Sequence, residues 1–144
     1  MPPPPLTKQD FEALARFRFG IRRYLRFSEE IVRRHGISPQ QYQLLLALKG
    51  FPGRDWATVG ELAERLQLRH HSTVELVNRA QGQKLVRRAP DPDDARMVRV
   101  GLTSQGERAL AELSALHRSE LERMGTVLAL PSWEAPEPAE PTGP

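Results

Sequence analysis

Apolar residues recur at helical spacing in two long stretches, one near each end of the chain. Residues 7–35 carry one such stripe, and residues 104–128 carry another. We therefore predict two long helices that pack against each other. The apolar positions are Phe11, Leu14, Phe17, Ile21, Tyr24, Leu25, Ile31 and Val32 in the first helix, and Leu110, Leu113, Leu116, Leu121 and Met124 in the second.

A third predicted helix begins after Ser38 and ends near Lys49. Ser38 is a typical N-cap, Pro39 suits the first helical position, and Gln41 can complete a capping box. Because this helix is apolar on nearly every face, we expect it to be buried. After a short loop, residues 56–57 are a candidate for a short strand.

Residues 58–103 begin with two short helical patterns. Thr58 and Glu61 form a capping box that starts the first one. The connection to the second is too short for an antiparallel pair, so the helices must cross steeply, as in a helix-turn-helix. The second helix begins either at a capping box of Ser72 and Glu75 or a few residues earlier. Its core stripe consists of Thr73, Leu76, Val77 and Ala80.

A β-hairpin follows the two helices. Leu85 and Val86 lead into its first strand, and residues 89–95 form a turn rich in Asp and Pro. Val98, Val100 and Leu102 then alternate with more polar neighbours, as in a strand with one buried face. Together these elements predict a mainly α (α+β) fold, a winged helix-turn-helix with long N- and C-terminal helices that form a dimerisation region.

The domain organisation follows from the same pattern. We expect a single domain over residues 7–130, with a DNA-binding winged helix at 38–103 and dimerisation helices at 7–35 and 104–128. Residues 1–6 are proline-rich, and residues 131–144 are rich in Pro and Glu. Neither segment can bury enough apolar surface to fold, so we predict that both are disordered.

Charge and composition narrow the range of partners. Three of the 18 acidic residues and none of the 21 basic residues lie after residue 130, so residues 1–130 carry a formal charge of +6. This excess suits a polyanion partner. The absence of cysteine excludes disulfides and thiol redox sensing. No apolar run is long enough to span a membrane and no secretory signal is visible, so we expect a cytoplasmic protein.

Enzymatic signatures are missing from the sequence. The four histidines lack metal-ligand spacing, and the acidic turn lacks the Gly and terminal Glu of a calcium loop. No glycine-rich phosphate loop or nucleophile elbow is present. We therefore expect neither an enzyme nor a bound metal or cofactor.

The exposed face of the second short helix carries side chains that can read DNA in the major groove. Asn78 can bond to an adenine edge, and Val74 can meet a thymine methyl group. The two histidines can donate to guanine or phosphate, and a helix N-terminus at Ser72 favours phosphate. The candidate recognition residues are Arg69, His70, His71, Ser72, Val74 and Asn78, with Glu75 on the same face.

The hairpin supplies a second group of candidate DNA contacts. Arg96 at its tip suits a narrow minor groove, and Asp94 can orient it through a carboxylate–guanidinium bond. Arg87 and Arg88 at its base are expected to contact phosphates. The alternative is an ordinary exposed hairpin with paired charges.

These motifs resemble the MarR-type (multiple antibiotic resistance regulator) family of winged-helix transcription factors. The similarity covers about residues 6–128. It rests on ELAERLQL (61–68), STVELVNRA (72–80), KLVRR (84–88), DPDDAR (91–96) and VGLTSQGERAL (100–110).

The resemblance implies a homodimer built from the first and last helices, with recognition helices about 34 Å apart. It also implies a repressor that binds a pseudo-palindromic operator in double-stranded DNA. A small aromatic effector would release that DNA, although no ligand-binding residue is identified in the sequence.

Three departures from the family pattern affect these expectations. Lys84 stands where the family usually has Gly, and Gly82 lies two residues earlier. Ala80 replaces a larger apolar residue. The Pro/Glu-rich end replaces a further helix, so the dimer interface should be smaller. A winged-helix protein-interaction module without DNA binding is the alternative function, because a fold alone does not determine function.

Overall fold

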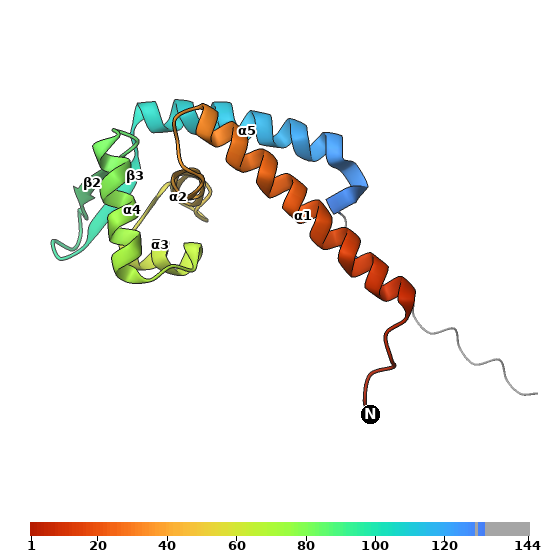
Figure 1. The fold of residues 1–144 in the computed structure, drawn as a ribbon. Coiled ribbons are helices and arrows are strands. Elements are labelled where there is room, and N and C mark those ends of the chain that lie inside the picture. Colours follow the sequence, from red (N-terminus) through yellow and green to blue (C-terminus); the bar gives the residue numbers. More distant parts are fainter. Residues whose placement is uncertain (129, 132–144) are drawn as a thin grey trace, which may run out of the picture.

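The computed structural model describes residues 1–128, 130 and 131, so most of the predicted disordered tail lies outside the described residues. Residues 1–7 form no helix or strand, and the predicted disorder of residues 1–6 stays a prediction. The elements (Figure 1) are α1 (Lys8–Arg34), α2 (Pro39–Lys49), β1 (Trp56–Ala57), α3 (Val59–Leu66), α4 (His70–Gly82), β2 (Val86–Pro90), β3 (Val98–Leu102), α5 (Ser104–Met124) and the 3-10 helix η1 (Gly125–Leu128).

Capping boxes start the first three helices, as predicted for α2 and α3. Thr7, Ser38 and Thr58 are the N-caps, and each side chain accepts from the backbone N–H three residues later. At α3, for example, Glu61 N donates to Thr58 Oγ1 at 3.3 Å and Thr58 N donates to Glu61 Oε1 at 3.0 Å. These reciprocal bonds satisfy backbone donors that the helix leaves unpaired.

The sequence allowed α4 to begin at the capping box of Ser72 or a few residues earlier, and the structure shows the earlier start. The helix begins at His70, with Arg69 as an N-cap that makes no side-chain capping bond. Thr73 N donates to Arg69 O at 3.0 Å, and Thr73 Oγ1 donates to the same carbonyl at 2.9 Å. The capping box of Ser72 and Glu75 is therefore not used, and both histidines lie in the first turn.

The predicted helix 104–128 is too long at its C-terminal end. α5 ends at Met124, because Gly125 has φ 53° and ψ −123°, outside the helical region. Residues 125–128 form the turn η1 instead. At the other end Thr103 is the N-cap, with Gly106 N donating to its hydroxyl at 3.0 Å.

The strands form a small antiparallel sheet in the order β1-β3-β2, which includes the short strand expected at Trp56 and Ala57. Trp56 pairs with Gly101, and Arg88 pairs with Val100. The predicted turn was too long, because residues 89 and 90 extend β2 and pair with β3. Pro90 is tolerated there at the end of an edge strand, where its missing N–H costs no ladder bond.

The core lies where the helices meet the inner face of the sheet. α2 is central to the core. The expectation that it is buried was wrong for one face, because Leu46 is half exposed. The fully buried core side chains come from every layer of the fold and include Val32, Leu44, Leu45, Leu48, Leu62, Val77, Val100 and Leu113.

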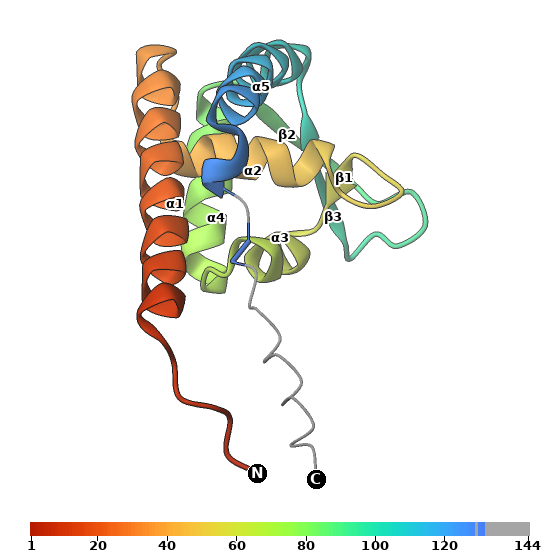
Figure 2. The same cartoon turned by 90° about the vertical axis from the view of Figure 1, so that its right-hand side faces the viewer.

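The long helices lie on one side of the molecule and the helix-turn-helix with its hairpin on the other. α1 and α5 contact each other, and the hairpin points away from α1 (Figures 1 and 2). Several large apolar side chains on the long helices remain exposed, with Phe11 at 55% and Phe19 at 59%. No described helix is both long and apolar enough to cross a membrane.

Candidate nucleic-acid interface

α3 and α4 form a helix-turn-helix with a tight connection. Gln67 adopts a left-handed conformation with φ 54°, and Leu68 N donates back to Ala63 O at 2.9 Å. This backbone reversal ends α3 and leaves only residues 67–69 between the helices. α4 therefore crosses α3 and exposes one long face.

The predicted core stripe of α4 is confirmed, because Thr73, Leu76, Val77 and Ala80 are all buried. The opposite face is available to a partner. His71 and Asn78 on this face are exposed, and Val74 is half-buried beside them. The exposed members of the candidate set are Arg69, His70, His71 and Asn78, and Glu75 on the same face is exposed as well.

Ser72 lies on a different flank of α4 from Asn78. It lines a cleft of about 230 Å³ between α2 and α4, together with Gln40 and Arg79. Arg79 was not among the residues predicted from the sequence, although its position one turn after Glu75 and two turns after Ser72 places it on this flank. A basic side chain here broadens the positive surface around α4.

Asn78 is bonded to the hairpin. Its side-chain oxygen accepts from Arg88 Nη2 at 2.7 Å, and Gln81 accepts from the other terminal nitrogen of Arg88. Arg88 thus joins α4 to β2. The Asn78 amide nitrogen is not used in this contact and can still donate.

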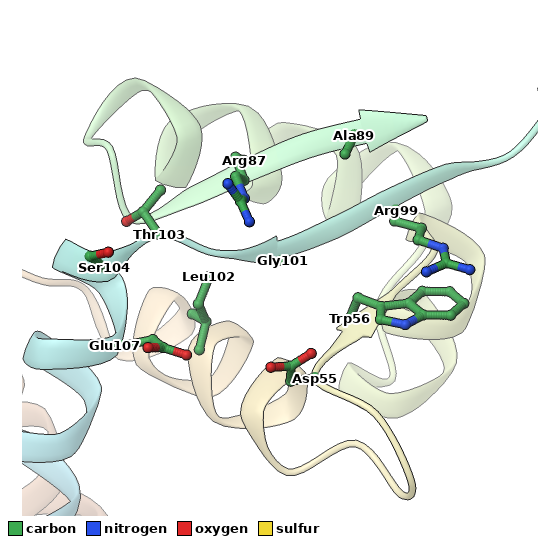
Figure 3. Close-up of a pocket in the computed structure, with 10 residues that line it drawn as sticks. All are labelled: Asp55, Trp56, Arg87, Ala89, Arg99, Gly101, Leu102, Thr103, Ser104 and Glu107. Carbon is green, nitrogen blue, oxygen red and sulfur yellow. The ribbon is translucent and has the colours of Figure 1, made fainter. Parts of the chain in front are cut away.

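Arg87 and Arg88 point to opposite faces of the sheet, because successive strand residues alternate. Arg87 points into a cleft of about 580 Å³ on the outer face (Figure 3), where Trp56 and Arg99 also lie. The two arginines predicted at the wing base therefore lie on different faces of the sheet, and their contacts with phosphates stay a prediction. The other lining residues are Asp55, Ala89, Gly101, Leu102, Thr103, Ser104 and Glu107.

At the tip of the hairpin, the predicted contact between Asp94 and Arg96 is present. Arg96 N donates to Asp94 Oδ1 at 3.0 Å, and Arg96 Nε lies 3.5 Å from the same oxygen. The Arg96 side chain is 93% exposed. Its guanidinium group is therefore held at its base and free at its end to enter a groove.

A second ion pair at the tip was missed by the sequence reasoning. Arg99 Nε donates to Asp91 Oδ2 at 2.7 Å, and the Asp91 side chain is only 7% exposed. The backbone N–H groups of Asp93 and Asp94 donate to its other oxygen at 2.9 and 3.0 Å. The hydrogen bond from Arg99, supported by these amides, holds the pKa of Asp91 below its ordinary value.

The described part of the chain contains no group of three or more His, Asp or Glu side chains placed to hold a metal ion. The winged helix at residues 38–103, called the DNA-binding lobe below, presents a set of exposed amide, imidazole and guanidinium donors on α4 and the hairpin. Such donors match the edges of bases and the oxygens of phosphates.

Comparison with known proteins identifies similar sequences. The sequence profile of the MarR family matches residues 35–97. The uncharacterized HTH-type transcriptional regulator YsmB of Bacillus subtilis is 33% identical over 101 residues. This match covers 66% of the chain and 63% of YsmB, so the chain spans less than two thirds of the length of that relative.

Solved structures share the fold. A MarR family protein from Bacillus stearothermophilus is 26% identical with a TM-score of 0.72, over 83% of this chain and 82% of that one. A variant of Staphylococcus aureus MepR bound to an oligodeoxyribonucleotide is 22% identical with a TM-score of 0.65, over 75% of this chain and 77% of that one.

Proposed function

The chain belongs to the MarR family of winged helix-turn-helix proteins, and on this premise we propose that it is a cytoplasmic transcriptional regulator that binds double-stranded DNA. This is a family of regulators and not of enzymes, as expected from the sequence. The observation that carries the proposal is the exposed face of α4, which presents polar and basic side chains beside a hairpin with an exposed arginine at its tip. The solved complex of MepR with DNA supports it by similarity.

In this proposal α4 enters the major groove and Arg96 enters the adjacent minor groove. Asn78 and Val74 read base edges, Arg69, His70 and His71 bond to bases or phosphates, and Ser72 bonds to phosphate. Arg87 and Arg88 contact the backbone. Asp94 orients Arg96, since a carboxylate–guanidinium contact restricts its rotamers.

The wing assignment is tested with Arg96→Ala on duplexes selected by the protein from random DNA. We expect the free energy of binding to weaken by about 1–2 kcal/mol with the fold intact, measured by fluorescence anisotropy and circular dichroism. Across a salt series, log affinity should fall steeply with log salt, because each neutralised phosphate releases counterions. Unchanged affinity in the variant would contradict the wing assignment.

The base-reading role of Asn78 needs a matched control, because Asn78 also bonds to Arg88. Asn78→Ala should relax base preference more than it lowers affinity for random DNA. Gln81→Ala also removes an acceptor of Arg88 and should leave base preference unchanged. An equal loss on all sequences for Asn78→Ala would show that Asn78 does not read bases.

We further propose a homodimeric repressor that binds a pseudo-palindromic operator. The support is the set of exposed apolar side chains on the long helices, since such patches mark interaction surfaces. Phe19→Glu should yield monomers in sedimentation equilibrium and lose the preference for a full operator over a half-site. If the variant remains dimeric, Phe19 does not lie in the dimer interface. The exposed side chains are Phe11, Phe19, Leu25, Leu116 and Leu121.

A small aromatic effector completes the proposal. The rings of Tyr24, Phe27, Tyr42 and His117 lie together where α1, α2 and α5 meet, between the long helices and the DNA-binding lobe. A flat ring inserted here would displace these helices. Adding a phenolic acid to the protein–operator complex should release the DNA. If the complex retains the DNA at saturating concentrations of the acid, the effector proposal is refuted.

The alternative function is a protein-interaction module. If the parent protein does not bind DNA even at low salt, that alternative is favoured.

A further inference from the structure

Four arginine and aromatic side chains form a continuous stack along the outer side of the lobe. The guanidinium carbon of Arg54 lies 4.2 Å from the ring centre of Phe51 and 4.0 Å from that of Trp56. Arg99 covers the ring of Trp56 at 3.7 Å (Figure 3). All four side chains are half-buried. We name Phe51, Arg54, Trp56 and Arg99 the arginine–aromatic stack.

One end of the stack reaches the tip of the hairpin. Arg99 donates to Asp91, and Asp91 accepts the backbone N–H groups of Asp93 and Asp94. Asp94 in turn accepts the backbone N–H of Arg96. In each of these hydrogen bonds the acceptor is the carboxylate of Asp91 or Asp94, and each bond fixes the part of the turn that follows. The conformation of the tip therefore depends on where Arg99 is held.

The other end of the stack is fixed to the first helix of the helix-turn-helix. Arg54 is paired with Glu61, which also completes the capping box of α3. Arg65, one turn further along α3, lies 4.8 Å from the ring centre of Phe51. The stack thus connects α3, which supports α4, to the turn that carries Arg96.

The chemistry of the stack favours a fixed geometry. Guanidinium groups are planar and stack on aromatic faces, whereas the ammonium group of lysine is a compact charge on a flexible stem. Trp56 is held between two such groups by its place in β1, opposite Gly101. Because both arginines stack on the Trp56 ring, a shift of the ring or of one arginine changes the position of the other.

We propose that the arginine–aromatic stack positions Arg96 relative to α4, so that both parts of the DNA-binding surface keep one spacing. The stack itself does not touch DNA in this role. The inference rests on the proposed binding of DNA by the hairpin. It predicts that Trp56 and Arg99 act on DNA affinity only through Arg96.

The test combines a measurement on the free protein with a double-mutant cycle. Trp56→Leu removes the stacking surface without a change of charge, and Arg99→Lys keeps the charge but loses the planar group. In the free protein, NMR should show faster hydrogen exchange of the Asp94 and Arg96 amides in both variants. Arg123→Lys alters a comparable pair with Glu120 inside α5 and should leave those amides unchanged.

With DNA, Trp56→Leu should weaken binding of the selected duplex roughly 3- to 10-fold in the parent, a coupling typical of residues that share one network. In the Arg96→Ala background the same substitution should have almost no effect. Unchanged amide exchange at the tip, or an equal loss of affinity in both backgrounds, overturns the positioning role. A parent that binds no DNA refutes the proposed function, and the exchange rates still decide whether the stack orders the tip.

Discussion

Replacement of Lys84 by glycine should stabilise the protein, because Lys84 occupies a backbone conformation that favours glycine. Its φ is +62°, and it follows Gln83, the C-cap of α4. Leu85 N donates to Ala80 O and Lys84 N donates to Gln81 O, both at 2.9 Å. These two bonds define a Schellman motif, in which the left-handed residue after the helix is usually Gly. The MarR-type pattern that the sequence resembles has glycine at this position, and the left-handed φ of Lys84 gives a physical reason for it.

The magnitude follows from two opposing terms. A side chain with a Cβ in the left-handed region costs about 1–2 kcal/mol, which the substitution removes. Glycine makes the unfolded chain more flexible, which costs about 0.4–1 kcal/mol. The free energy of unfolding should therefore rise by about 0.5–1 kcal/mol, or about 2–4 °C in Tm for a chain of this size. The Lys84 side chain is exposed, so its loss leaves no cavity.

The assay is guanidinium-induced unfolding at a fixed protein concentration, since dimer formation would make stability depend on concentration. Lys84→Ala is the matched control, because it removes the same charge and stem but keeps the Cβ; it should give no gain. The reverse change, Gly36→Ala, should destabilise, because Gly36 fills the same position after α1 with φ +75°. An equal gain for Ala and Gly at position 84 would refute the reasoning from backbone strain.

Three further predictions concern contacts between elements. Gly106→Ala should destabilise the fold by about 1–3 kcal/mol in thermal unfolding, because a Cβ there would lie 2.0 Å from Leu85 O; unchanged stability would show that the backbone adjusts freely. Asp91 has a folded pKa below its ordinary 3.8, so its stabilisation of the tip should be complete above about pH 4 and lost as pH falls through the folded value. Asp91→Asn should abolish this acid transition in NMR titrations, and its persistence would assign it to another group. Ser28→Ala should cost about 1–3 kcal/mol in chemical unfolding, since it leaves the buried His117 Nε2 without its partner at 2.7 Å; a neutral result would mean that water replaces the hydroxyl.

Sequence patterns determined most elements of the fold because their signals are local. The capping boxes at Ser38 and Thr58 involve residues three apart, and helical or strand periodicity is visible within a few turns. The core stripe of α4 and the short strand at Trp56 were predicted correctly for the same reason.

Boundaries were less predictable where two local signals compete. Ser72 offered a capping box, but burial of Thr73 and its bonds to Arg69 favour an N-cap three residues earlier, at Arg69. At the end of α5, apolar residues continue the helical pattern, but the backbone of Gly125 ends the helix. Packing against other elements of the fold decides where such a helix begins or ends, and a short stretch of sequence carries no information about that packing.

The candidate site shows the same division. The sequence by itself determined which chemical groups the lobe presents, and it predicted the contact of Asp94 with Arg96, two residues apart in one turn. Only the tertiary structure decided that Asn78 bonds to Arg88 and that Trp56 lies under Arg99. Those partners come from different helices and strands, so their pairing depends on the crossing of α4 with the hairpin and on the register of β1 against β3. Neither quantity is encoded in the spacing of residues along the chain.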